Sequence, residues 1–408
     1  MHSFFPSAIL ALLITASAVR AEPGVVVSLA SVGDRVRAQN PDLAAARLRI
    51  REALGRMNQS GRLANPEIET EISHDPRYRE RKLEIGFNQR FPLTNRLRLE
   101  KDVTLAEYKS SEAEVREVER QIIAEAREGV VNVLAIRSRR ELLNQQSALS
   151  KEFADFLSAV ADKGEGSRLD AGQAKLEAAS LALEMRQLDA SETAAVGTLK
   201  PLLGMMPAET LMVSGTLPVP ALPTAAVDHV RRPDYQAAVL QADAAAKGVA
   251  LEQAKRYDDV EAGIFAGAEK TEDAPEGYDK EALVGVRFKF PLPLWNKNEG
   301  AIQEAQALKE RKDKEASALA RSIHLEAEAA RAEMEQWQKL LAETGETLLP
   351  LAEEQAKAAE DAYRKGQGEL QTVFRMREKR VQLLAARLDA LRQFHLARVR
   401  YESALAKP

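Results

Sequence analysis

Residues 83–96 read LEIGFNQRFPLTNR, and residues 284–297 read VGVRFKFPLPLWNK. Each stretch alternates apolar and polar residues, reaches a Phe-Pro-Leu triplet, and then loses the alternation. Such alternation predicts a β-strand with one apolar face, and proline ends a strand because it cannot donate the ladder hydrogen bond. The chain therefore makes the same passage from strand to helix twice, about 200 residues apart.

The segments before these two stretches also correspond. The first repeat opens at Asn40-Pro41-Asp42, runs through a helical segment and then gives another alternating strand after Asn65-Pro66. The second repeat opens at Arg232-Pro233-Asp234 and gives a strand-like run over residues 260–266. Proline after a polar residue is typical of the first turn of a helix. Both repeats therefore predict a helix followed by two strands.

Long helical sequence follows each pair of strands and is broken once by a glycine-rich turn. These turns read KGEG at residues 163–166 and KGQG at residues 365–368. We interpret them as the tips of hairpins between two long helices. We place a first structural repeat at residues 22–220 and a second at 221–408, each with one helix, two strands and a long helical hairpin. The expected fold class is α+β.

The helices are longer than a globular core requires. Residues 93–200 contain no proline, and a helix over residues 95–163 would be about 100 Å long at 1.5 Å per residue. Pro350 should kink the corresponding helix of the second repeat. Apolar residues step by three and four along both helices, as packed helices require. These seams are Val115, Val118, Ile122, Ala126, Val130 and Val133, and Ile323, Ala327, Ala330, Met334, Trp337 and Leu341.

The strands fit either a half-buried soluble sheet or part of a membrane barrel. Aromatic residues that could lie at a membrane interface accompany them: Tyr78, Phe91, Tyr278, Phe290 and Trp295. Four strands cannot close a barrel, and an open edge in lipid leaves backbone groups unpaired at several kcal/mol each. A membrane location would therefore require an oligomer.

The N-terminus resembles a secretory signal. Residues 8–19 are apolar, and Val19-Arg20-Ala21 is a small-residue cleavage pattern, so residues 1–21 are expected to be a signal peptide. A membrane anchor is the alternative, but the apolar run is shorter than the about 20 residues that span a bilayer. The sequence has no cysteine, which excludes disulfides and a lipidated cysteine.

The composition argues against nucleic-acid binding and against catalysis. The net charge is −4, and no basic stripe is interleaved with aromatic residues. The histidines are scattered, and the sequence has neither a two-histidine zinc motif nor a phosphate-binding glycine loop. We therefore expect no enzyme, no cofactor and no resident metal.

An acidic segment between the last two strands leaves one alternative open. Its carboxylates could hold a hard cation loosely, but a solvated loop is the more economical interpretation. They are Glu269, Glu272, Asp273, Glu276 and Asp279.

Taken together, these motifs resemble the TolC family of outer-membrane efflux proteins from about Asn40 onward. The resemblance lies in the doubled plan, the Asn-Pro openings, the Phe-Pro-Leu triplets and the sequence Tyr363-Arg-Lys-Gly366. The segment PLPLWNKN at 291–298 and the missing lipidation cysteine are most similar to the CzcC-type branch, which is associated with export of divalent heavy-metal cations.

The resemblance implies an assembly and partners. Three chains would each contribute four strands to one twelve-stranded barrel in outer-membrane lipid, continued by a helical tunnel through the periplasm of a Gram-negative bacterium. Such a homotrimer would be a passive conduit that docks to a periplasmic adaptor and an inner-membrane efflux pump. The tips at Gly164, Gly166, Gly366 and Gly368 would be the docking surface.

The resemblance also implies a periplasmic gate. In the family, a tyrosine before the second tip and acidic residues after the tips help to close the aperture. Tyr363 and Asp170 match these positions. Thr372 and Arg375 stand where acids are expected after the second tip, so Arg375 could pair with Asp170 instead.

Two alternatives to metal export remain. The first is a channel of the same kind for organic compounds or drugs, since a conduit carries what its pump delivers. The second, from another class, is a periplasmic coiled-coil adaptor or scaffold, because long heptad hairpins suit those proteins too. The strands discriminate, since an adaptor should have one hairpin rather than two that each follow a pair of alternating strands.

Overall fold

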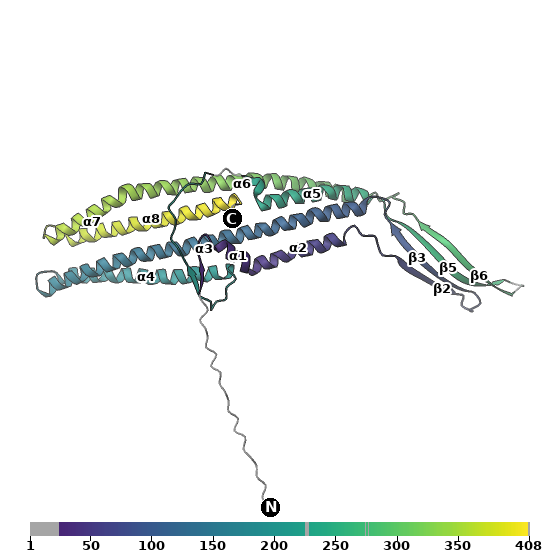
Figure 1. Ribbon diagram of the computed structural model, residues 1–408, viewed down its shortest axis with the longest axis horizontal. Coiled ribbons are helices and arrows are strands. Elements are labelled where there is room, and N and C mark those ends of the chain that lie inside the picture. The colour runs from purple at the N-terminus through teal and green to yellow at the C-terminus, as the bar shows by residue number, and fades with distance from the viewer. Residues whose placement is uncertain (1–23, 225–227, 274, 276, 407–408) are drawn as a thin grey trace, which may run out of the picture.

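The computed structural model describes residues 24–224, 228–273, 275 and 277–406. The expected signal peptide lies outside them. Figure 1 shows an elongated molecule with the long helices along its length, a sheet at one end and two helical tips at the other. Within the described ranges, no helix is long and apolar enough to cross a membrane.

Both halves of the chain contain the expected series of a helix, two strands and a long helical hairpin. The first half has α2 (Pro41–Gln59), β2 (Glu67–His74), β3 (Arg81–Phe91), α3 (Arg96–Asp162) and α4 (Arg168–Leu202). The second half has α5 (Pro233–Ala254), β5 (Val260–Asp273), β6 (Gly277–Lys289), α6 (Glu299–Glu343), α7 (Leu349–Arg364) and α8 (Leu370–Ala404). The predicted helix over residues 95–163 is confirmed as α3.

Short elements lie at the middle of the molecule, two before the first half and two between the halves. They are β1 (Val25–Val27), α1 (Val32–Gln39), β4 (Leu211–Val213) and the 3-10 helix η1 (His229–Arg231). β1 and β4 pair in parallel and cover the α3–α4 hairpin together with α1 (Figure 1). We call this region the waist.

The Asn-Pro opening is a helix start. The Asn40 side chain accepts a hydrogen bond from the Leu43 amide at 2.7 Å, and Pro41 occupies the first turn of α2. This cap satisfies an amide that has no partner inside the helix. α5 also begins with a proline, Pro233, but there Arg232 precedes the helix without a side-chain cap.

The predicted apolar seams are the helix contacts. In α3, Ala126, Val130 and Val133 are buried in the cluster that includes α1 and α4. In α6, Ala327, Ala330 and Met334 are buried against α8. Alanine and valine at these positions let long helices approach closely, so the seams hold the hairpins together.

The break predicted at Pro350 is a π-helical turn, η2 (Thr344–Leu348), between α6 and α7. The Pro350 ring lacks an amide hydrogen and would clash with the carbonyl of Glu346, four residues earlier. A turn with i to i+5 hydrogen bonds absorbs this mismatch without ending the helical path.

The four long strands form one antiparallel sheet in the order β2-β3-β5-β6. Ile68 lies opposite Phe87, and Phe87 lies opposite Ile264, which in turn faces Val286. The register therefore places most apolar residues of the four strands on one face, which we call the apolar face, and leaves Phe265 and Leu283 on the other.

Candidate functional site

The apolar face of the sheet is exposed within the chain. Val284 is 85% exposed and Ile68 is 76% exposed. An exposed, contiguous apolar surface is rare on a soluble monomer and marks contact with lipid or protein. The face consists of Ile68, Ile72, Leu83, Ile85, Phe87, Ile264, Val284, Val286 and Phe288.

The opposite face, which we call the charged face, is a network of ion pairs across strands. Arg287 of β6 reaches Glu84 of β3 at 2.5 Å and Glu69 of β2 at 3.1 Å. Lys82 pairs with Glu71 at 3.1 Å and with Glu84 at 3.0 Å. These pairs fix the register with polar groups, which suits a surface that faces water rather than lipid.

Glycines on the charged face make room for one aromatic ring. The Phe265 ring lies over Gly285 on the neighbouring strand, where any side chain would collide with it. The guanidinium of Arg287 lies over the same ring, 5.3 Å from its centre. The cation therefore has both an aromatic partner and carboxylate partners.

The sheet has two free edges. Within the described chain, β2 pairs with β3 alone, and β6 pairs with β5 alone. Their outer backbone groups are unpaired, which in lipid costs several kcal/mol each. Strands of other copies of the chain can satisfy them.

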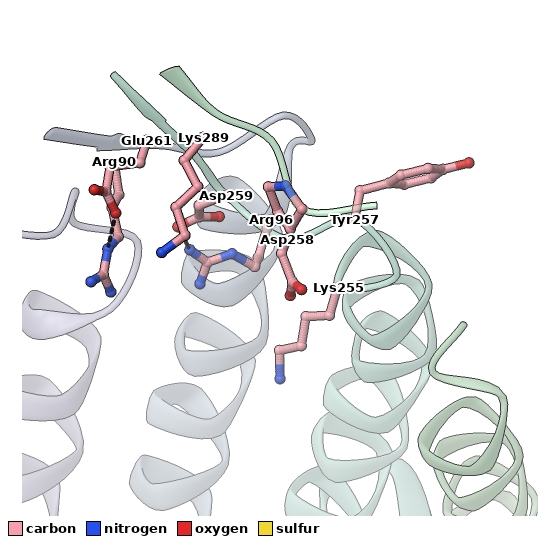
Figure 2. Close-up of a pocket in the computed structure, with 9 residues that line it drawn as sticks. Arg90, Arg96, Lys255, Tyr257, Asp258, Asp259, Glu261 and Lys289 are labelled. Atoms are coloured by element: carbon pink, nitrogen blue, oxygen red, sulfur yellow. Dashed lines mark hydrogen bonds and ion pairs between the residues drawn. The ribbon is translucent and has the colours of Figure 1, made fainter. Parts of the chain in front are cut away.

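A charged pocket of about 560 Å³ lies where the sheet meets the helices. Figure 2 shows Arg96 at the start of α3 directed toward Asp259, just before β5, and Arg90 toward Glu261. The Arg96–Asp259 distance is 2.7 Å, and the Arg90–Glu261 distance is 3.4 Å. The first pair joins α3 of one half to the start of β5 of the other, and the second joins β3 to β5. The sequence reasoning missed them, because the partners are more than 160 residues apart.

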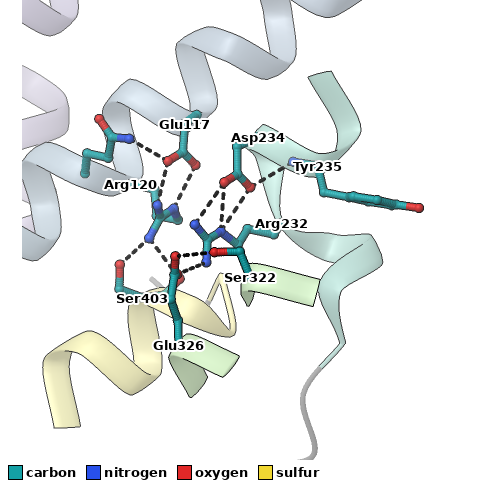
Figure 3. Close-up of polar contacts among 9 residues, drawn as sticks. Glu117, Arg120, Arg232, Asp234, Tyr235, Ser322, Glu326 and Ser403 are labelled. Carbon is teal, nitrogen blue, oxygen red and sulfur yellow. Dashed lines mark hydrogen bonds and ion pairs between the residues drawn. The ribbon is translucent and has the colours of Figure 1, made fainter. Parts of the chain in front are cut away.

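The waist contains a second network between the two halves. Arg232, before α5, is buried and binds Glu326 of α6 at 2.7 Å and Asp234 at 3.0 Å. Figure 3 shows these groups beside Arg120 of α3, whose guanidinium binds Glu117 and Ser403 of α8. The opening Arg-Pro-Asp of the second half is thus an ion-pair junction as well as a helix start.

At the tips, the two hairpins of the chain are in contact. The Tyr363 hydroxyl donates a hydrogen bond to Asp170 at 3.3 Å, and the Tyr363 ring meets Phe153 edge to face. Burial, followed by the nearby Asp170 charge, raises the pKa of Tyr363. The hydroxyl therefore keeps its proton and remains a donor at neutral pH.

Asp170 has a favourable position for its charge. The Ser167 hydroxyl caps α4 by accepting hydrogen bonds from the amides of Leu169 and Asp170. Asp170 lies in the first helical turn, where the helix dipole stabilises an anion.

Arg375 and Thr372 lie together, but not on Asp170. Arg375 donates to the Thr372 hydroxyl at 3.4 Å. No Arg375–Asp170 ion pair is present among the described residues, so the alternative pairing is not formed within one chain. The nearby cation that bridges elements is Arg377, which binds Glu360 at 2.7 Å and lies over the Phe153 ring at 4.3 Å.

Glu360 completes this cluster. Burial favours the neutral carboxyl, but the ion pairs with Arg377 and Arg364 outweigh it and hold the pKa of Glu360 below its ordinary value. The second hairpin tip is therefore held by a carboxylate between two arginines.

The glycines of the tips do not all have the same role. Gly164 and Gly366 have positive φ values of 76° and 71°, a conformation that other residues rarely adopt. Gly166 and Gly368 instead lie close to the preceding helical turn, where a side chain would crowd Val160 and Tyr363 respectively. The repeated glycine pattern thus sets the two sharp turns.

In the acidic segment, Glu272 pairs with Arg79 at 2.7 Å, and no cluster of three or more ligating residues suited to a metal occurs in the described part of the chain. Glu276 lies outside the described residues, and the Asp273 side chain is not described.

Comparisons with known proteins agree with this architecture. Residues 32–205 match the family model described as outer membrane efflux protein. Comparison with curated proteins finds no match.

Several solved structures have the same fold. The outer-membrane channel OprN is 18% identical with a TM-score of 0.78, and the match covers 93% of this chain and 90% of that one. CusC is 14% identical with a TM-score of 0.77 over 92% and 91%. The outer membrane protein VceC from Vibrio cholerae is 19% identical with a TM-score of 0.75 over 93% and 96%.

These findings confirm the predicted α+β fold of long helical hairpins with a four-stranded sheet, and the family match agrees with the expected outer-membrane location and with transport rather than catalysis. Residues 32–205 are therefore similar in sequence to the outer membrane efflux protein family, and the described chain as a whole is similar in fold to the outer-membrane channel OprN.

Proposed function

We propose that this chain is the outer-membrane channel of a tripartite efflux system. Three copies each contribute one four-stranded sheet to a twelve-stranded barrel, and the helical hairpins continue the barrel as a tunnel. The chain is a passive conduit, and an inner-membrane pump with a periplasmic adaptor supplies energy and substrate.

One observation carries the assembly: the sheet has an exposed apolar face, a charged face and two free edges. Pairing β2 of one copy with β6 of the next satisfies both edges in every chain. The closed barrel then turns its apolar face to lipid and its charged face to a water-filled lumen. A periplasmic adaptor or soluble scaffold would be surrounded by water, where such an exposed apolar face is unfavourable.

The cargo is proposed to be divalent heavy-metal cations, as in the CzcC-type branch. Carboxylates outnumber basic side chains on the charged face, and a ring of them favours cations over anions. The carboxylates are Glu67, Glu69, Glu71, Glu84, Glu261, Glu269 and Glu281, and the basic residues are Lys82, Arg90, Arg287 and Lys289. Export of organic compounds is the second candidate, because a pump selects the substrate.

We also propose that Tyr363 and Asp170 form the closing contact of the periplasmic aperture. Arg375 and Thr372 lie beside this contact, where Arg375 is free to meet Asp170 of a neighbouring copy. The turns at Gly164, Gly166, Gly366 and Gly368 are the proposed docking surface, because they lie farthest from the sheet (Figure 1).

Cross-linking tests the assembly directly. The chain has no cysteine, so a Thr70→Cys, Val286→Cys variant has one thiol on β2 and one on β6. A short bis-maleimide should join three chains covalently in outer membranes. Each single variant is the control and should give no trimer. A double variant that remains monomeric would contradict the assembly.

Growth tests the cargo. A deletion strain should become sensitive to divalent metals such as zinc, cobalt or cadmium, and the intact sequence should restore growth. Sensitivity to drugs or detergents alone would retain the channel but reject metal export.

A further inference from the structure

Two histidines that are 95 residues apart in the sequence meet at the waist. His324 of α6 and His229 of η1 place Nε2 and Nδ1 3.1 Å apart. Their ring centres are 5.0 Å apart, with the planes inclined at 58°. The Tyr235 ring packs edge to face on His229, 4.9 Å between centres, and so limits how far the His229 ring can turn.

The separation of the two nitrogens suits a shared metal ion. Imidazole nitrogens bind zinc at about 2.0 to 2.1 Å, so two of them on one ion lie about 2.9 Å apart at a right angle and about 3.4 Å apart at a tetrahedral angle. The observed distance falls between these limits. In the hydrogen-bonded pair one of these nitrogens carries a hydrogen. For both nitrogens to bind a metal ion, the donor ring must take the other neutral tautomer, with that hydrogen on its second nitrogen, so that both facing nitrogens present a lone pair.

Few other protein ligands are available. Glu328 is four residues after His324 and therefore lies on the same side of α6, and it is exposed. No group of three or more ligating residues occurs in the part of the chain that the structure describes, so the two imidazoles are the protein ligands on which the site depends. Water would fill the remaining positions, and a site with two imidazoles and water suits copper(II), nickel(II) or zinc(II) better than calcium or magnesium.

We propose that His229 and His324 form a binding site for one divalent transition-metal ion per chain. The ion joins the connection between the two halves of the chain to α6. The Arg232–Glu326 ion pair, at 2.7 Å, already joins this connection to α6. The metal ion would add a second link between the same two parts of the chain. The site lies at the waist, away from the sheet and the tips, and does not depend on the proposed cargo.

Calorimetric titration of the purified full chain in detergent tests the site. Nickel(II) and zinc(II) are titrated separately into the protein and into the His229→Gln and His324→Gln variants. The matched control is His74→Gln, which changes an exposed histidine of β2. We expect one ion per chain, with affinity weakened by about tenfold or more in either waist variant and unchanged in the control.

Thermal stability gives a second readout. Metal should raise the melting temperature of the native chain and the control but not of the waist variants, because an ion that binds the folded state stabilises it. If His324→Gln fails to fold, His229→Gln decides, since η1 is a short surface element. Binding that survives both waist substitutions, or a native chain that binds neither ion at about 1 mM, would overturn the proposal.

Discussion

The hydroxyl of Tyr363 at the end of α7 and the carboxylate of Asp170 in the first turn of α4 are joined by a 3.3 Å hydrogen bond. The two residues are 193 positions apart, and each belongs to a different helical hairpin. The bond therefore ties the two hairpins of one chain together near their tips, where relative movement would widen a tunnel.

Loss of this bond should favour the open aperture. The double variant Tyr363→Phe, Asp170→Asn removes an interaction of about 1 kcal/mol per chain, so single-channel conductance in planar bilayers should rise several-fold. The matched control is Tyr108→Phe, which removes a bond to Glu112 on the same helix and cannot release a hairpin. Equal conductance of all three proteins would show that this contact is structural.

The two faces of the sheet should respond oppositely to charge. Val284→Lys places an ammonium on the apolar face and should cost about 2 to 4 kcal/mol in lipid, so less protein reaches the outer membrane. Leu283→Lys changes the adjacent residue, which lies on the charged face, and should be tolerated. The amount of folded trimer in membrane fractions measures both. Similar loss in both variants would argue against the assigned faces.

The waist should depend on Arg232. Arg232→Ala leaves the Asp234 and Glu326 carboxylates without their cation and should lower stability by about 2 kcal/mol, discounted because Glu326 is half exposed. Arg231→Ala removes an exposed arginine paired with Asp228 and should change stability by less than about 0.5 kcal/mol. Urea unfolding measures the free energy of unfolding of both variants. If Arg232→Ala leaves it unchanged, the ion pairs of Arg232 do not hold the two halves together.

Acidification should weaken the waist through His395. Burial, partly opposed by the hydrogen bond to the Pro218 carbonyl, lowers the pKa of His395, with Arg398 and Glu402 also acting on it. Between the lowered pKa and the ordinary one, His395 is therefore neutral in the folded chain and protonated in the unfolded chain. Stability is full above about pH 6.5 and falls at lower pH, by at most about 1.4 kcal/mol per pH unit.

Melting temperatures between pH 7.5 and 5.5 measure this effect. His395→Gln keeps a donor for the Pro218 carbonyl and should lose part of the pH dependence. His74→Gln, at an exposed site, should retain all of it. If His395→Gln follows the native profile, other groups cause the acid sensitivity.

Periodic features of the sequence were sufficient for much of the fold. Alternation in residues 284–290 gave β6 and its apolar face, and glycine-rich turns gave the hairpin tips. These features are local, since a strand or helix shows its own period in consecutive residues. The kink at Pro350 was likewise predictable from one residue. Its π-helical form was not, because it depends on how the preceding turn accommodates the missing hydrogen bond.

Contacts between the two halves of the chain could not be predicted from local sequence periods. Arg96 meets Asp259, and His229 meets His324, only because the two repeats pack side by side. The same packing brought Tyr363 to Asp170 and left Arg375 on Thr372. The family resemblance named Tyr363, Asp170 and Arg375 as candidates for closing contacts, but it left open whether Asp170 pairs with Tyr363 or with Arg375.

The sequence alone determined the doubled plan, the helical seams and the two-faced strands, because each depends on the order and spacing of neighbouring residues. Only the tertiary structure decided which ion pairs join the repeats, which tip residues touch, and that both sheet edges remain free within the described residues. Those outcomes depend on the relative placement of segments up to 283 residues apart, which no local period encodes.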